Sequence, residues 1–157
     1  MTNKISSIGV YTMAFVGIVD QLSKWAVLDK LGDVHNTIVL TPFLNIVLVW
    51  NKGITFGMLS SSSSTYTPYI LTSLAVIIMF MLGRWLLRTE SYAAALALGA
   101  VMGGATGNII DRLRYGKVVD FIDFHYNNYH WYAFNVADAA IVMGVTLLML
   151  DGMVRGK

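Results

Sequence analysis

Two aspartates, Asp120 and Asp138, stand in a mostly apolar chain at positions where a carboxylate is costly. Asp120 follows Val118 and Val119, and Asp138 lies four residues into the apolar run that begins at Phe134. An ionisable side chain at the edge of a bilayer is retained when it is paired or functional. Two acids that can meet at one membrane surface therefore indicate acid–base chemistry there.

The chemistry open to such a pair is specific. Two neighbouring carboxylates do not both ionise readily, so one of them keeps its proton. The ionised acid can take a proton from a water molecule. The protonated acid can hydrogen-bond a carbonyl group and later donate a proton to the leaving amine. This scheme needs neither a metal ion nor a nucleophilic side chain. The alternative is structural: Asp138 caps the fourth helix, and Asp120 lies in a solvated loop.

The composition is typical of a membrane domain. The chain has 157 residues, of which 56% are hydrophobic and 13% are charged, so we expect one integral-membrane domain over residues 1–157. The formal net charge is only +2 and no basic run is present, so we expect no nucleic-acid partner. The chain has no cysteine, which excludes disulfides, thiol catalysis and thiolate metal sites.

Four segments are long enough to cross a hydrocarbon core, which takes about 20 helical residues. They cover residues 8–28, 68–87, 92–110 and 134–153. An even number of spans puts both termini on one side of the membrane. The basic residues leave the orientation open, because five lie on the side of the termini and six on the other side.

Span parity brings the unusual polar residues to the side opposite the termini. That side receives the ends of the first and third spans, the start of the fourth span, and both long connections. It therefore collects Asp20, Lys24, Asn108, Asp111, Arg112, Asn135 and Asp138. Polar residues that converge from separate segments indicate a site.

The two long connections differ in character. Residues 38–50 are rich in Val, Ile, Leu and aromatic residues and are broken by Pro42, which predicts one or two strands at the membrane interface. Residues 51–57 are rich in turn-forming residues, and residues 60–64 form a serine linker. Residues 111–133 are rich in aromatic side chains, which is typical of a belt at the headgroup level.

Two groups within the spans have a clear structural explanation. Gly99, Gly103 and Gly107 form a smooth stripe, which favours close helix packing. Asp20 and Lys24 are four residues apart and can pair with each other. Structural pairing is the preferred interpretation of the second group.

A third group, on the third span, has two interpretations. Asn108 and Arg112 share a helix face, and Asp111 lies one turn from Asn108. These side chains either clamp helices together or line a site, and the residues alone do not decide between the two. A Ser23–Lys24 dyad is disfavoured, because adjacent helix residues do not face each other.

Metal binding and triad catalysis have weaker support. His35, His125 and His130, together with Asp120 and Asp123, could hold a metal ion, but no HExxH or comparable spacing is present. We therefore expect no metal and no other cofactor. A Ser-His-Asp triad is equally disfavoured, because the chain lacks a nucleophile elbow.

Two other classes of function stay open. A proton-coupled transporter or channel would use buried acids as a relay, but it needs polar residues through the full membrane thickness. The remaining polar residues of the spans, Arg84 and Asp151, lie near the opposite surface. A nonenzymatic assembly scaffold would explain the glycine stripe but not the polar residues that converge from separate segments.

Five blocks stand in order along the chain: DQLSK (20–24), NKGITFG (51–57), GGATGNIIDR (103–112), GKVVDFI (116–122) and FNVAD (134–138). Together, and on four spans at the right places, they closely resemble the bacterial lipoprotein signal peptidase family (signal peptidase II), which are aspartic membrane peptidases. The resemblance runs nearly from end to end. Thr55 departs from it, because alanine usually precedes the phenylalanine of the second block.

The resemblance implies a role for each matched position. The catalytic pair corresponds to Asp120 and Asp138, the lining of the site to Asn108, Arg112 and Asn135, the border of the substrate groove to Asn51 and Gly53, and a mainly structural pair to Asp20 and Lys24.

The resemblance also implies a fold, a substrate and a location. The fold is a mainly α membrane protein with four transmembrane helices, a small extracytoplasmic β-cradle and a short periplasmic helix that closes over the substrate. The partners are membrane lipids and a prolipoprotein that carries a diacylglyceryl-cysteine, which is cut just before that cysteine. We expect a monomer in the bacterial inner membrane, with cytoplasmic termini, a site near the periplasmic leaflet, and inhibition by globomycin-type cyclic peptides.

Overall fold

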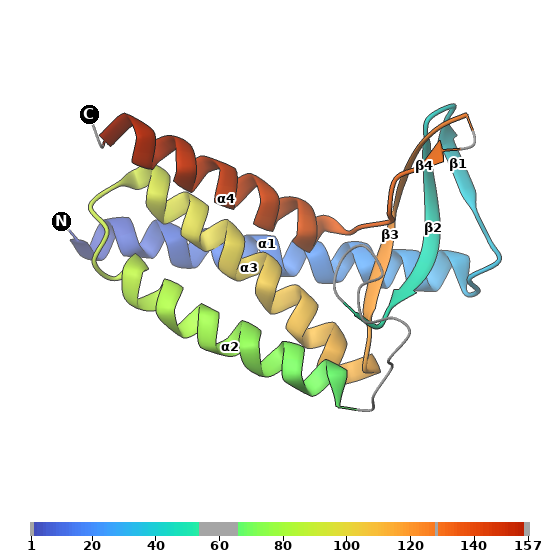
Figure 1. The fold of residues 1–157 in the computed structure, drawn as a ribbon, viewed down its shortest axis with the longest axis horizontal. Coiled ribbons are helices and arrows are strands. Elements are labelled where there is room, and N and C mark those ends of the chain that lie inside the picture. Colours follow the sequence, from blue (N-terminus) through green and yellow to red (C-terminus); the bar gives the residue numbers. More distant parts are fainter. Residues whose placement is uncertain (1, 54–65, 128, 156–157) are drawn as a thin grey trace.

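The computed structural model describes residues 2–53, 66–127 and 129–155. Within these residues, four helices are long and apolar enough to cross a membrane: α1 (Thr2–Leu31), α2 (Thr67–Leu86), α3 (Tyr92–Tyr115) and α4 (Val136–Arg155). The two termini lie at one end of the helix bundle and a small β-sheet lies at the other (Figure 1). The expected class, a mainly helical membrane protein with a small sheet, is confirmed.

Helix α3 is the central element, since α1, α2 and α4 all pack against it. In its most apolar stretch 56% of the residues are buried, whereas only 6% are buried in that of α2. Small residues make this packing possible, because the glycine stripe of α3 lets the backbone of α1 approach closely. A Cβ atom at Gly103 would lie 2.7 Å from the backbone oxygen of Met13. The packing interpretation of the stripe is confirmed.

Three helix ends at the side of the sheet differ from the expected spans by two residues or more. Helix α1 continues past residue 28 to Leu31. Helix α3 continues past residue 110 to Tyr115, because the polar residues of its last turns find partners and do not end it. It stops at Gly116, whose φ of 69° is left-handed and whose N–H donates to the Arg112 carbonyl oxygen. Helix α4 begins at Val136 rather than at residue 134, so Phe134 and Asn135 precede the helix.

The sheet is antiparallel, with the order β1 (Ile38–Thr41), β2 (Leu44–Asn51), β3 (Val118–Tyr126) and β4 (Tyr129–His130) among the described residues. The strands expected in residues 38–50 are confirmed as β1 and β2. Strand β3 was not predicted, because its aromatic side chains were interpreted as a headgroup belt. Phe121 is in fact buried, while the aromatic residues farther along, such as Tyr126, are exposed.

A small apolar cluster fixes the sheet to the end of α1. Leu31 of α1, Leu48 of β2 and Val119 of β3 are buried together. This contact fixes the position of β3 relative to the end of α1, and β3 carries Asp120. The serine linker, the short helix expected to close over the substrate, and Thr55 lie outside the described residues.

The close approach of α1 and α3 predicts the effect of one added methyl group. Gly103→Ala should lower the stability of the protein in detergent by about 1–3 kcal/mol, because the new Cβ meets backbone that cannot move aside. The measurement is the thermal unfolding midpoint of the purified variant. Gly152→Ala in α4 is the matched control, since a Cβ there meets no described atom within 4 Å. Equal midpoints for the two variants would contradict the packing argument.

Candidate active site

The two aspartates of interest come from different elements and meet at one asparagine. Asp120 lies on β3 and is 2% exposed, and Asp138 lies in the first turn of α4 and is half-buried. The side-chain amide of Asn135 donates to Asp120 Oδ1 over 2.7 Å. The same side chain accepts from the Asp138 backbone N–H over 2.9 Å through its oxygen. Asn135 therefore fixes the position of one acid relative to the other.

The contacts between Asn135 and Asp138 also begin helix α4. The Asn135 side chain accepts from the N–H three residues later, and Asp138 Oδ2 accepts from the Asn135 N–H over 3.3 Å. This reciprocal arrangement is a capping box. The structural explanation for Asp138 is therefore correct, but it leaves Asp138 beside the other acid. The structural explanation for Asp120 is wrong, because this residue is buried in a strand.

Two further asparagines orient the carboxylates. Asn108 of α3 donates to Asp138 Oδ1 over 2.8 Å and accepts from Asn135 over 3.2 Å. Asn51, at the end of β2, donates to Asp120 Oδ2 over 3.0 Å. The oxygen of Asn51 accepts from the Gly53 N–H over 3.0 Å, which aims its amide group at the acid. Each carboxylate thus accepts hydrogen bonds from two neighbours.

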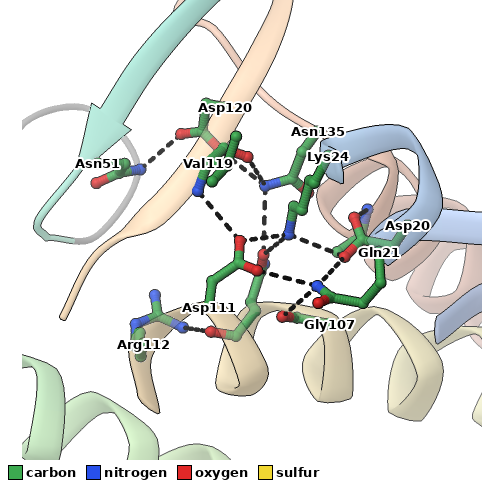
Figure 2. A network of polar contacts seen from close by, with 12 residues as sticks. Asp20, Gln21, Lys24, Asn51, Gly107, Asp111, Arg112, Val119, Asp120 and Asn135 are labelled. Atoms are coloured by element: carbon green, nitrogen blue, oxygen red, sulfur yellow. Dashed lines mark hydrogen bonds and ion pairs between the residues drawn. The ribbon is translucent and has the colours of Figure 1, made fainter. Parts of the chain in front are cut away.

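A buried ammonium group lies behind this layer (Figure 2). Lys24 Nζ of α1 is 2.9 Å from Asp20 Oδ2 and 2.8 Å from Asp111 Oδ2, and it donates to Asn108 Oδ1 over 3.0 Å. All these side chains are buried. Asp20 and Lys24 form the ion pair that their spacing predicts. Asp111 joins α3 to α1 through Lys24, as the clamp interpretation of the third span expects.

The two acids of this network also accept backbone N–H groups. Asp111 Oδ2 accepts from Val119 on β3 over 3.1 Å, and Asp20 Oδ1 accepts from Ala137 in the first turn of α4 over 2.9 Å. A carboxylate at a helix N-terminus is favoured by the free N–H groups and by the helix dipole. The network therefore positions the strand that carries one aspartate and the helix that carries the other.

The Ser23–Lys24 dyad does not form. Ser23 Oγ donates to the backbone oxygen of Asp20 over 2.7 Å, while the ammonium group faces the buried network. Sequence reasoning did not assign Gln21, which donates to Asp111 Oδ1 over 2.9 Å and to the Gly107 oxygen over 3.2 Å. Its place beside Asp20 in a polar run within an apolar span was the available signal.

Arg112 lies at the edge of the site. It is half-buried, and its guanidinium donates to the Asn108 backbone oxygen over 3.4 Å. Its charge acts on Asp138 most strongly and on Asp120 next. Arg112 therefore brings a positive charge to the paired acids without making a side-chain hydrogen bond to either among the described contacts.

The environment of Asp120 favours its neutral form. Burial and then the negative charge of Asp138 raise the pKa of Asp120 from 3.8 to about 7, against the hydrogen bonds from Asn51 and Asn135 and the attraction of Lys24. One carboxyl group of the pair thus keeps a proton in neutral or weakly acidic water, as two neighbouring acids require. The arrangement provides an acid and a base side by side.

The possible metal ligands divide into two groups. Asp123, His125 and His130 lie together on β3 and β4, with ligand atoms within 4.8 Å of one another. His35 and Asp120 do not belong to this group. The three residues are separate from the hydrogen bonds that hold the paired acids.

The fold and the site together define a multi-pass membrane protein with paired carboxylates at one end of its helix bundle. The family model described as signal peptidase (SPase) II matches residues 12–154. This chain belongs to the signal peptidase II family, which places it among the peptidases.

Curated relatives and solved structures agree with this membership. A lipoprotein signal peptidase of Methylobacterium sp. (strain 4-46) is 38% identical over 146 residues, which cover 92% of this chain and 87% of the relative. One of Burkholderia mallei (strain SAVP1) is 41% identical over 142 residues, covering 87% and 81%. A solved bacterial membrane enzyme, determined in meso at 2.3 Å resolution, has a TM-score of 0.80 at 29% identity, covering 95% of this chain and 91% of that one.

The buried network predicts a large effect of removing its cation. Lys24→Met should lower the free energy of unfolding by about 3–5 kcal/mol, because Asp20 and Asp111 are then buried without their partner. Lys30→Met, on an exposed position of the same helix, should cost less than about 1 kcal/mol. Unfolding in detergent measures both. A stable Lys24→Met protein would show that the ammonium group does not organise the bundle.

The raised pKa of Asp120 predicts a pH-dependent stability. Between pH 3.8 and about 7 the folded protein holds a proton on Asp120 that the unfolded chain has lost, so this contribution to stability falls as the pH rises. Asp120→Asn removes the contribution, so the variant should gain stability relative to wild type between about pH 4 and about pH 8. Thermal unfolding across this range measures the difference. Asp29→Asn, an exposed control, should track wild type.

Proposed function

We propose that this chain is an aspartic endopeptidase that removes the signal peptide from diacylglyceryl-modified prolipoproteins and cuts just before the lipidated cysteine. The observation that carries the proposal is that Asn135 makes hydrogen bonds to both Asp120 and Asp138. These contacts hold the two acids beside each other, which the water-activating scheme requires. The relatives named as lipoprotein signal peptidases support the substrate class.

The proposed reaction uses the two acids in different states. Asp120 holds the proton, in keeping with its raised pKa, and Asp138 is the ionised base. Asp138 takes a proton from a water molecule, whose oxygen attacks the scissile carbonyl carbon while Asp120 protonates the carbonyl oxygen. The tetrahedral intermediate then collapses. Asp120 recovers its proton from a hydroxyl group as the carbon–nitrogen bond breaks, and Asp138 gives its proton to the leaving amine of the cysteine.

The bundle suits a substrate with acyl chains. The outward faces of α2 and α4 expose large apolar residues such as Phe80 and Met143, which are surfaces for lipid. The acyl chains stay in the bilayer while the peptide reaches the acids at the side of the sheet. Arg112 orients the peptide carbonyl group through its charge, and Asn51 and Gly53 border the peptide.

The orientation in the membrane and the oligomeric state follow from the same family resemblance. Both termini lie in the cytoplasm of a bacterial cell, with the sheet at the outer surface of the inner membrane. The enzyme is a monomer and is blocked by globomycin-type cyclic peptides. The family resemblance supports these statements, and the common end of the two termini is consistent with them (Figure 1).

The distribution of buried polar residues disfavours the transporter alternative. In the described part of the chain, they gather at the two ends of the bundle, with Thr89 and Ser91 at the end of the termini and the larger group at the sheet. Ser91 donates to Asp151 over 2.9 Å. A proton path would need groups between these ends.

The proposed mechanism predicts the loss of cleavage when either acid loses its ability to ionise. Asp120→Asn and Asp138→Asn should each abolish cleavage of a diacylglyceryl-modified lipobox peptide, because the amide can neither give up nor accept the transferred proton. The measurement is mass spectrometry of the products from purified protein in detergent. The site of the cut, before the lipidated cysteine, is read from the same spectra.

Controls separate chemistry from folding and from metal catalysis. Asp29→Asn carries the same change at an exposed position and should keep wild-type turnover. The inactive variants should insert in the membrane and unfold in a cooperative transition, which shows that they are folded, although their midpoints differ from that of the control. Cleavage that persists in a chelator distinguishes the carboxylate pair from a metal-activated water. Turnover near that of wild type in either active-site variant would rule out the two-acid mechanism.

A further inference from the structure

A compact group of metal-ligand side chains lies on the outer hairpin of the sheet. Asp123 and His125 are two residues apart on β3 and so share one face of the strand, and His130 of β4 is the cross-strand partner of His125. The ligand atoms of the three side chains lie within 4.8 Å of one another. The hydrogen bonds of the active site do not involve any of these side chains.

The facing nitrogen atoms converge on one buried carboxylate. Asp123 has an 8% exposed side chain, and its Oδ2 is 2.9 Å from His130 Nδ1 and 4.0 Å from His125 Nδ1. The two imidazole rings stack with centroids 5.1 Å apart and an angle of 17° between their planes. The same two nitrogens therefore face the same oxygen from neighbouring strands.

The side-chain amide of Asn45 bridges the carboxylate and one of the imidazoles. Asn45 Nδ2 is 3.1 Å from Asp123 Oδ2 and 3.4 Å from His125 Nδ1. An amide NH₂ group donates, so the His125 nitrogen acts as an acceptor and directs its lone pair toward the cluster. His130 Nδ1 donates to the Asp123 carboxylate in the metal-free protein, and a metal ion that binds both groups takes the place of this proton. A neutral imidazole nitrogen is also the form that binds metals.

We propose that Asp123, His125 and His130 form a binding site for a divalent transition metal of the Zn²⁺ class. Zn²⁺ binds nitrogen and carboxylate ligands at about 2.0–2.2 Å, so tetrahedral ligands lie roughly 3.4 Å apart. The observed separations of 2.9 and 4.0 Å bracket that value. Two imidazoles select Zn²⁺, Cu²⁺ or Ni²⁺ over Mg²⁺ and Ca²⁺. Water completes the coordination on the exposed side of His130.

The bound ion fixes the hairpin and the segment that returns to the active site. His130 is followed by residues 131–134, and Phe134 pairs with Ile122 on β3 through backbone hydrogen bonds. The next residue is Asn135, which holds both acids. A metal that joins β3 to β4 therefore secures the start of the segment that positions Asn135. The ion takes no part in the cleavage itself.

The test is a titration of the full-length protein in detergent, with any affinity tag removed, against Zn²⁺ alone. We expect one equivalent to bind, with a rise in the thermal unfolding midpoint that depends on Zn²⁺ concentration. Co²⁺ in place of Zn²⁺ should give visible absorption bands of a nitrogen- and oxygen-ligated site, and Mg²⁺ should have no effect. Mutation of outer-shell partners typically costs 10–100-fold in metal affinity, and His125→Ala and His130→Ala should lose at least as much.

His35→Ala is the matched control, because it removes an exposed histidine that is not in the cluster. It should bind Zn²⁺ as wild type does. His130 is itself largely exposed, so its replacement should leave the metal-free unfolding midpoint near that of wild type. The proposal is overturned if folded wild type does not bind Zn²⁺ saturably, or if both cluster variants bind with unchanged affinity.

Discussion

The site depends on one buried ammonium group. Lys24 is removed from water and compensated by Asp20 and Asp111, and a charge in such surroundings is stable only with close, well-oriented partners. Each partner in turn accepts a backbone N–H, from α4 in one case and from β3 in the other. A single cation thereby determines where the strand and the helix that carry the two acids lie relative to α1 and α3.

The site uses the same atoms for folding and for chemistry. Asn135 and Asp138 begin helix α4 as a capping box, and the same side chains hold the paired acids. The geometry of the acids therefore depends on the helix start, which is a rigid feature. Asn108, on the central helix, links this layer to the buried network by contacting both Lys24 and Asp138. A shift of Asn108, Asn135 or Asp138 would therefore break contacts that hold α1, α3 or the start of α4 in place.

The convergence of the polar residues on one end of the bundle could be predicted from the sequence, because it depends on span parity and on polar residues that are rare in lipid. Asp20, Asn108 and Asn135 could be assigned to one membrane surface without any knowledge of contacts. Strand β3 was missed, because its valines and aromatic residues are equally suited to a strand and to an interfacial belt. Asp123 and His130 could be grouped with other possible metal ligands from their residue types, but their contact follows only once β3 and β4 are paired.

The position of the lysine on the first helix has a consequence for biosynthesis. Helix α1 is made long before α3, so Lys24 enters the membrane before Asp111 exists. A lone charge raises the free energy of insertion by about 2.5–3.5 kcal/mol at the centre of a span and by less toward its ends, where Lys24 lies. Asp20, one turn away on the same helix, is a partner that is present before α3 is made, so the two residues can enter the membrane as a neutral ion pair. Asp111 can then join the ion pair later, when α3 enters the membrane and packs against α1.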